Sequence, residues 1–307
     1  MTDEGPKRLS VAYFPSREAE ILGGHAYLLS RDIPLGILPI GGTSRNANFK
    51  VELSSPEEDR TTWLTKFLDF GRYERHALDE SLVEFVETSA EYISNFGEVF
   101  FEILADADGA PLELAPLPPG RVMAMPRSYR QVVPKKDREE VGKSFASIPR
   151  NRIWRLSLPA ELGSARAHRR LLRRLAALSS PSIPSFALGN PLDQGRSVGY
   201  EFTAHREAAD RLMERATRRW GTTMSVQRPV GDSNEYFFIS RRLEFSKAQA
   251  LLREHLVSEL NALLKRLAVE VSVEMSGTPT ARDISVALRR LHQGEISFAE
   301  ALDSART

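Results

Sequence analysis

Cysteine is absent from the 307 residues, so the chain has no disulfide, no thiolate nucleophile and no metal bound through a thiolate. No stretch approaches the ~18 consecutive apolar residues that a membrane-spanning helix needs, and the first ten residues are polar, with no apolar signal core behind them. Net charge is small as well, because 42 Lys and Arg stand against 41 Asp and Glu. These absences predict cytoplasmic synthesis and no membrane partner, and they leave any nucleic-acid contact to local patches.

The signatures of phosphate loops, zinc helices, nucleophile elbows, dinucleotide-binding folds and paired catalytic carboxylates are missing too. Glycine doublets at 23–24 and 41–42 lack the neighbours of a phosphate loop and predict turns. The 6 histidines never lie within four residues of one another, so no helix offers a histidine pair to a metal. Acid pairs such as Glu139-Glu140 lie in polar stretches where the burial that raises a catalytic pKa is not expected. We therefore predict no catalytic residue, cofactor or metal, and a structural role.

The composition, with 41% hydrophobic and 27% charged residues, is that of a globular protein with two or three domains. Residues 1–58 mix short β-like runs, Val11–Phe14 and Ile33–Ile40, with glycine and proline, which indicates an extended N-terminal arm. A short apolar run around Trp63–Leu68 predicts one helix.

The next segment has the clearest local signals. Asp79 is the expected N-cap of a helix that ends before Gly97. A β-hairpin follows, with Asp108-Gly109 at its turn. The expected continuation is a proline corner at 116–119, a strand at Arg121–Met125, a basic loop at Arg127–Lys143 and a strand at Ile153–Leu156.

Two charged helices come next, joined by a loop-rich insertion at 179–202 with a possible strand near Phe186. The first spans Ala165–Leu178; the second begins at Thr203 as N-cap, ends near Trp220 and contains the i, i+4 pairs Glu207–Arg211 and Glu214–Arg218. Their arginines either contact DNA phosphates or pair with Glu207, Asp210 and Glu214 or a neighbouring subunit. The candidate DNA-facing or inter-subunit residues are Arg166, Arg169, Arg170, Arg173, Arg174, Arg211, Arg215 and Arg218.

The remainder, 222–307, is predicted to be mainly helical. A strand pair at Met224–Val226 and Tyr236–Ile239 precedes a capping box at Ser246 and Gln249, which is expected to open a long helix. A strand at Val269–Val273 follows, and further capping boxes, Thr280 with Asp283 and Ser297 with Glu300, open two short helices on either side of Gly294. The long helix carries a stripe suited to helix packing or oligomer formation: Leu252, Leu256, Leu260, Leu263 and Leu267.

The order of helix, hairpin, proline corner and strand resembles the wing region of tailed-bacteriophage portal proteins, the head-to-tail connector family. The residues that carry the likeness are Asn95–Phe100, Leu114–Val122 and Ile148–Ile153. The resemblance implies an α+β, portal-like fold: a wing-like unit at 59–160, stem-like helices at 161–221 with a clip-like insertion at 179–202, and a helical C-terminal region at 222–307. The chain and its insertion are short, so it resembles a compact or divergent member.

What the resemblance implies about function is a ring of about a dozen subunits in the virion, at one capsid vertex. Double-stranded DNA passes through such a ring during packaging and ejection, and the implied protein partners are terminase, the major capsid protein and head-tail adaptor proteins. Two alternatives stay open: a nucleic-acid-binding protein that uses the Arg166–Arg174 helix, and an enzyme of a class whose motif is not visible.

Overall fold

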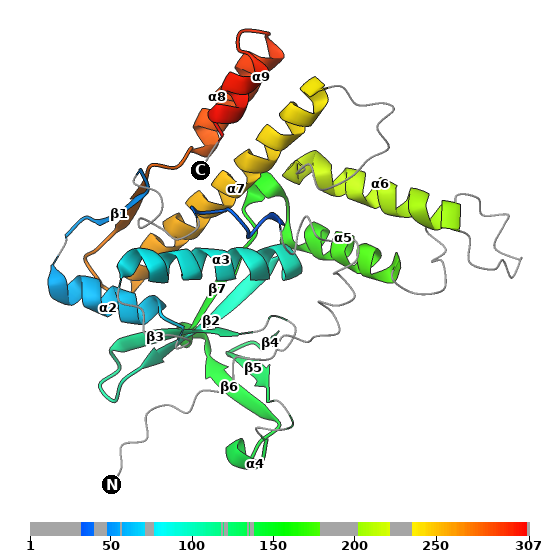
Figure 1. The fold of residues 1–307 in the computed structure, drawn as a ribbon. Helices are drawn as coiled ribbons and strands as arrows, with labels where there is room; N and C mark the ends of the chain where they lie inside the picture. The colour runs from blue at the N-terminus through cyan, green and yellow to red at the C-terminus, as the bar shows by residue number, and fades with distance from the viewer. Residues whose placement is uncertain are drawn as a thin grey trace, which may run out of the picture.

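The computed structural model describes residues 32–39, 48–55, 57–70, 77–117, 119, 122–133, 135, 138–178, 202–221 and 235–305. Helices and small antiparallel sheets make up the described chain, which confirms the α+β class (Figure 1). The predicted elements at Val11–Phe14, near Phe186 and at Met224–Val226 lie outside these residues.

In chain order the elements are β1 Lys50–Leu53, α2 Glu58–Leu68, α3 Leu78–Phe96, β2 Glu98–Ala105, β3 Pro111–Leu117, β4 Val122–Ala124, β5 Ser128–Val132, α4 Arg138–Val141, β6 Phe145–Pro149, η5 Arg150–Arg152, β7 Ile153–Ser157, η6 Ala160–Leu162, α5 Ala165–Leu178, α6 Phe202–Trp220, α7 Glu235–Arg266, β8 Val273–Ser276, α8 Ala281–His292 and α9 Phe298–Asp303.

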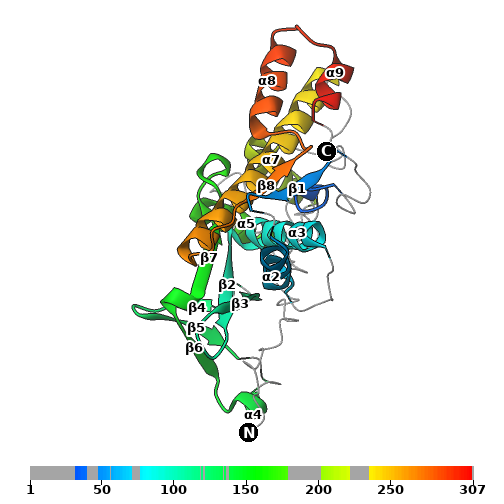
Figure 2. The same ribbon diagram turned by 90° about the vertical axis from the view of Figure 1, so that its left-hand side faces the viewer.

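The main core lies between the sheet β3-β2-β7 and the helices α2, α3 and α7. Its centre is aromatic: the rings of Phe85 and Trp154 stack with centroids 5.8 Å apart, and Phe101 lies 5.5 Å from Trp154. These rings come from α3, β2 and β7, so one cluster fixes the helix on the sheet. Viewed from the side, the molecule is long, with α8 and α9 at one end and the sheet β4-β5-β6 at the other (Figure 2).

The predicted helix and hairpin at 79–114 are confirmed, with one change at the start. Helix α3 has Ala77 as its N-cap, and Asp79 lies in the first turn, where its charge still favours the helix N-terminus. Gly97 ends the helix at φ 80°, and its N–H donates to the Ile93 carbonyl at 2.7 Å. At the hairpin turn Gly109 has φ 87°, and the Asp106 carboxylate accepts from two backbone N–H groups. Left-handed backbone at both glycines is what the sequence indicated.

The prediction of a basic loop at 127–143 is wrong, because this segment contains strand β5 and the short helix α4. Strand β5 pairs with both β4 and β6 in a second small sheet. Tyr129 and Ile148 pack with Phe100 and Leu117, so apolar contact with the main sheet orders a segment whose composition is polar.

The strand predicted at Tyr236–Ile239 and the helix start at Ser246 are both wrong. Helix α7 begins at Glu235 and runs for 32 residues. Ile239 and Leu243 are buried in a cluster that includes Ile284 and Leu288 of α8, and this packing decides in favour of helix. The side chain of Gln249 caps nothing, and instead donates to the backbone carbonyls of a segment near the N-terminus.

The strand predicted at Val269–Val273 is shifted, because β8 begins at Val273. Asn261 of α7 fixes the register: its amide nitrogen donates to the Val273 carbonyl at 3.0 Å, and its oxygen accepts from the Val273 N–H at 2.8 Å. The predicted capping boxes at Thr280 and Ser297 are confirmed at the starts of α8 and α9.

The described parts of the N-terminal region pack on this same chain. Residues 32–38 form turns and bends rather than the expected β-like run, with Ile33 and Ile37 fully buried, and β1 pairs with β8. Arg253 of α7 is 3% exposed and donates to the carbonyls of Ile37 and Pro279; burial lowers its pKa to about 10. Among the described residues, no helix has the length and apolar character that crossing a bilayer requires.

Candidate functional site: the basic helix pair

Helix α5 is anchored on α3 by a buried histidine. His168 Nε2 donates to the Ser94 carbonyl at 2.6 Å, and its ring lies 5.6 Å from that of Trp220. Because a carbonyl only accepts, Nε2 carries the hydrogen, and burial lowers the pKa of this ring, which keeps it neutral. One face of α5 therefore packs against α3 and Trp220, and the arginines lie on its other face.

Arg169 of α5 forms an ion pair with a carboxylate of the main sheet. Its guanidinium donates to Glu98 Oε1 at 2.7 Å, while Arg155 of β7 reaches Glu98 Oε2 at 2.7 Å. Glu98 is 6% exposed, at the start of β2. The prediction that Arg169 pairs with Glu207, Asp210 or Glu214 is wrong, because Arg169 pairs instead with the buried Glu98 carboxylate next to α5.

Helix α6 lies against α5 and α7 through Ala208, Leu212 and Trp220, all of which are buried. The predicted pair of Glu214 and Arg218 is confirmed at 3.0 Å on the exposed surface. Gly221 ends the helix at φ 65°, where an added Cβ would collide with the backbone of Phe245 and Arg241. The end of α6 therefore touches the backbone of α7 directly, which fixes the direction in which the helix pair points.

The other predicted arginines lie on the outer surface of the pair. Exposed side chains are Arg166, Arg170, Arg173, Arg211, Arg215 and Arg218, while Arg169 and Arg174 are half-buried. A groove of about 340 Å³ between α5 and α6 is lined by Arg170, Arg174, Arg215, Arg218 and Arg219, together with Leu162, His168, Leu171 and Trp220 among others. The described residues that line it include no carboxylate.

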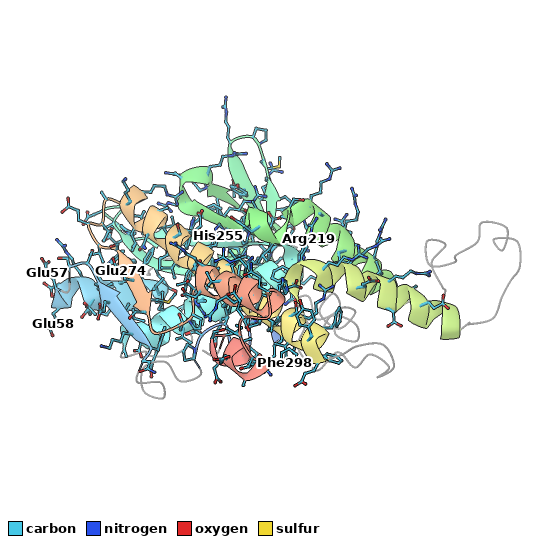
Figure 3. The ribbon with its side chains drawn as sticks, turned by 90° about the horizontal axis from the view of Figure 1, so that it is seen from above. Glu57, Glu58, Arg219, His255, Glu274 and Phe298 are labelled. Atoms are coloured by element: carbon cyan, nitrogen blue, oxygen red, sulfur yellow. The ribbon has the colours of Figure 1, made fainter. Side chains whose placement is uncertain are left out.

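A second groove, of about 550 Å³, continues from the first between α6, α7 and α8. Arg218, Arg219 and Leu162 line both. The second groove adds Lys247, Arg289 and His292 and two acids, Glu161 and Glu244. Together they form a continuous concave surface with an excess of positive charge, which favours anionic groups. We call it the basic grooves; Arg219 lies where the helix pair joins the body (Figure 3).

Sequence reasoning found the arginines of α5 but missed the grooves. Arg219 is four residues after Arg215, so both lie on the same face of α6, and this spacing was a usable signal. Lys247 and Arg289 come from α7 and α8, and only the tertiary structure brings them to Arg219.

The leucine stripe of α7 lies inside the chain. Leu252, Leu256, Leu260 and Leu263 are buried in the main core, and Leu267 packs at its edge. The stripe contributes to packing within one subunit, against α3 and its neighbours.

Carboxyl groups with a raised pKa lie away from the basic grooves. Burial raises the pKa of Glu87, with the charge of Glu84 adding to it, and burial raises the pKa of Glu102 against the opposing effect of Arg152. Within the described part of the chain, no group of three or more His, Asp or Glu is placed to hold a metal ion. The chemistry that the grooves themselves offer is electrostatic binding.

Comparison with known proteins gives a likeness to solved structures and none by sequence. No protein-family model and no curated protein matches the sequence. Among solved structures, a chain from the neck of an empty GTA particle, computed with C6 symmetry, matches with a TM-score of 0.48 and 11% sequence identity. The match covers 99% of this chain and 96% of that chain. At this score and identity the likeness carries no conclusion about function.

Proposed function

We propose that this chain is a structural subunit of a tailed-phage portal ring, which forms the DNA conduit at one capsid vertex. The observation that carries the proposal is the layout after the hairpin sheet. Helices α5 and α6 lie side by side and project away from the sheet, and the chain leaves α5 and enters α6 at the same outer end (Figure 1). This is the arrangement expected of a stem with a clip-like insertion, attached to the wing-like unit of α3 and the sheet β3-β2-β7.

In a ring of identical subunits each copy uses two different faces, one toward each neighbour. The projecting helix pair provides one such face, and the chain between α5 and α6 provides a docking point for terminase and head-tail adaptor proteins. The wing-like unit is left for contact with the major capsid protein. A net charge of +1 suits a conduit, since DNA that must slide cannot be held by a large excess of cations.

The test is the mass of the purified protein by light scattering, with electron microscopy of the same sample. One chain has a mass of 34.4 kDa, so a ring of about a dozen has a mass of about 410 kDa. We expect a mass in that range and circular particles with a central hole. A stable 34.4 kDa monomer at high concentration contradicts the proposal.

A second candidate, a nucleic-acid-binding protein, is favoured by one observation, the arginine-lined groove between α5 and α6. Replacing Arg166, Arg170 and Arg173 with glutamine tests it and spares Arg169, which holds Glu98. Under this alternative the variant loses DNA retention at low salt, and wild-type retention falls steeply as salt is raised. Under the portal proposal alone the variant still forms rings, and loss of the rings makes these arginines contacts between subunits.

A further inference from the structure

A negatively charged edge lies at the end of the molecule opposite α5 and α6. We call it the acidic edge and define it by residues of β1, β8 and the start of α2, all of them exposed: Glu52, Glu57, Glu58, Asp59 and Glu274. Glu57, Glu58 and Glu274 lie together on one side in Figure 3, and the basic helices extend to the other side.

Two of these carboxylates are placed unfavourably for an isolated subunit. In the β1-β8 ladder Glu52 is directly opposite Glu274, and both side chains lie on the exposed face of the two-stranded sheet. Like charges directly opposite each other destabilise an antiparallel pair. Lys50 is the next residue of β1 on that face, but its cross-strand partner is Ser276.

Within the described ranges, Glu52, Glu58, Asp59 and Glu274 have no ion pair, while Glu57 pairs with Arg60 at 3.0 Å. At the other end of the molecule the same holds for Arg166, Arg170, Arg173 and Arg215. The subunit therefore has unneutralised charge of opposite sign at its two ends. Those ends cannot meet within one chain, because α3 and α7 lie between them (Figure 1).

We propose that the basic grooves of one subunit receive the acidic edge of the next copy of this chain. The inference rests on the ring proposed above and names its contact surfaces. A contact between different ends of identical chains is head-to-tail, and it closes into a ring when the rotation per copy permits. The occupant of the grooves is then the β1-β8 ladder with the first turn of α2, and guanidinium groups neutralise the Glu52 and Glu274 pair.

A second copy explains both surfaces, whereas DNA explains one. DNA phosphates satisfy the arginines but leave Glu52 facing Glu274, and the acidic edge repels them. Both grooves also contain apolar floor residues, Leu162 with Leu171 in one and Leu251 with Leu288 in the other, which suit a protein surface with mixed polarity.

Reciprocal charge reversal tests the contact. Variant A carries Arg170→Glu and Arg215→Glu, and variant B carries Glu52→Lys and Glu274→Lys. All four side chains are exposed, so circular dichroism should show both variants folded. We expect each variant alone to need a roughly tenfold or higher concentration to form rings, since each reversal replaces attraction by repulsion at every contact.

An equimolar mixture of variants A and B should form rings again. The acidic grooves of A then meet the basic edges of B, and the basic grooves of B meet the acidic edges of A. A single variant with all four reversals should also reassemble.

Control variants place charge reversals in and next to the β4-β5-β6 sheet: a double Arg→Glu reversal to match variant A, and a single Glu→Lys reversal in α4. Arg127→Glu with Arg130→Glu, and separately Glu139→Lys, change exposed residues away from both surfaces and should leave ring formation unchanged.

If variant A or B forms rings at the wild-type concentration, the inference is overturned and the proposed ring still stands. The same conclusion follows if neither the mixture nor the fourfold variant assembles. Loss of DNA retention by variant A with its rings intact assigns the grooves to nucleic acid and also overturns it. A wild-type chain that stays monomeric overturns both proposals.

Discussion

Replacing Glu98 with glutamine should loosen the joint between α5 and the main sheet. Glu98 is 6% exposed and accepts from Arg155 Nε at 2.9 Å and from Arg169 at 2.7 Å. Hydrogen bonds to a charged group contribute about 1.5–3 kcal/mol each. Arg155 and Arg169 are 50% and 42% exposed, so water replaces much of what they lose. The net loss should be about 2 kcal/mol, which for a chain of 307 residues lowers Tm by about 3 °C.

The assay is thermal unfolding followed by circular dichroism, with urea unfolding as a second measurement. Glu80→Gln is the matched control, since Glu80 is an exposed carboxylate on α3, and it should change stability by less than ~0.5 kcal/mol. Arg169→Gln should cost less than Glu98→Gln, because Arg155 still neutralises the carboxylate. Equal melting of Glu98→Gln and Glu80→Gln would refute the role given to Glu98 in holding α5.

Three further predictions concern buried or strained positions. Because burial lowers the pKa of His168 below 6.5, the unfolded chain takes up the proton first; Tm should fall as the pH drops below about 6.5, and His168→Gln should flatten that part of the profile. Gly221→Ala should cost about 3 kcal/mol or more by urea unfolding, since its Cβ meets the α7 backbone, whereas Gly109→Ala, with open space around it, should cost only the ~1–2 kcal/mol of left-handed strain. The folded-state pKa of Glu87 is raised, so its charged form is unfavourable at neutral pH; Glu87→Gln should raise Tm at pH 7 and lose that gain as the pH falls below about 4, where Glu87 becomes protonated in both states.

Local signals predicted the parts of the fold that local contacts decide. The end of α3 follows from Gly97, the hairpin turn from Asp108-Gly109, and the starts of α8 and α9 from side chains three residues apart. Each of these features depends on residues within about one turn of the chain, so the local sequence contains every residue that determines it.

The errors arise where a distant segment decides. The aromatic run Tyr236–Ile239 has the propensity of a strand, but contact with α8 makes it the first turn of α7. Arg169 was visible as part of a basic helix, yet its partner Glu98 is 71 residues away. The basic grooves need side chains from α5, α6, α7 and α8, and no spacing along the chain indicates that these meet.

The attachment of residues 32–39 to α7 has a consequence during synthesis. Gln249 donates to the Ile33 carbonyl across 216 residues of sequence, and β1 pairs with β8 over a similar separation, so neither contact can form until the later segment has been synthesised. At about 5–20 residues per second, a ribosome leaves the N-terminal segment without its partner for roughly 10–45 s. Ile33 and Ile37, fully buried in the finished subunit, are accessible to chaperones and proteases for that interval. Assembly of the subunit is therefore timed by the emergence of α7, and nascent chains stalled before α7 should be degraded rather than folded.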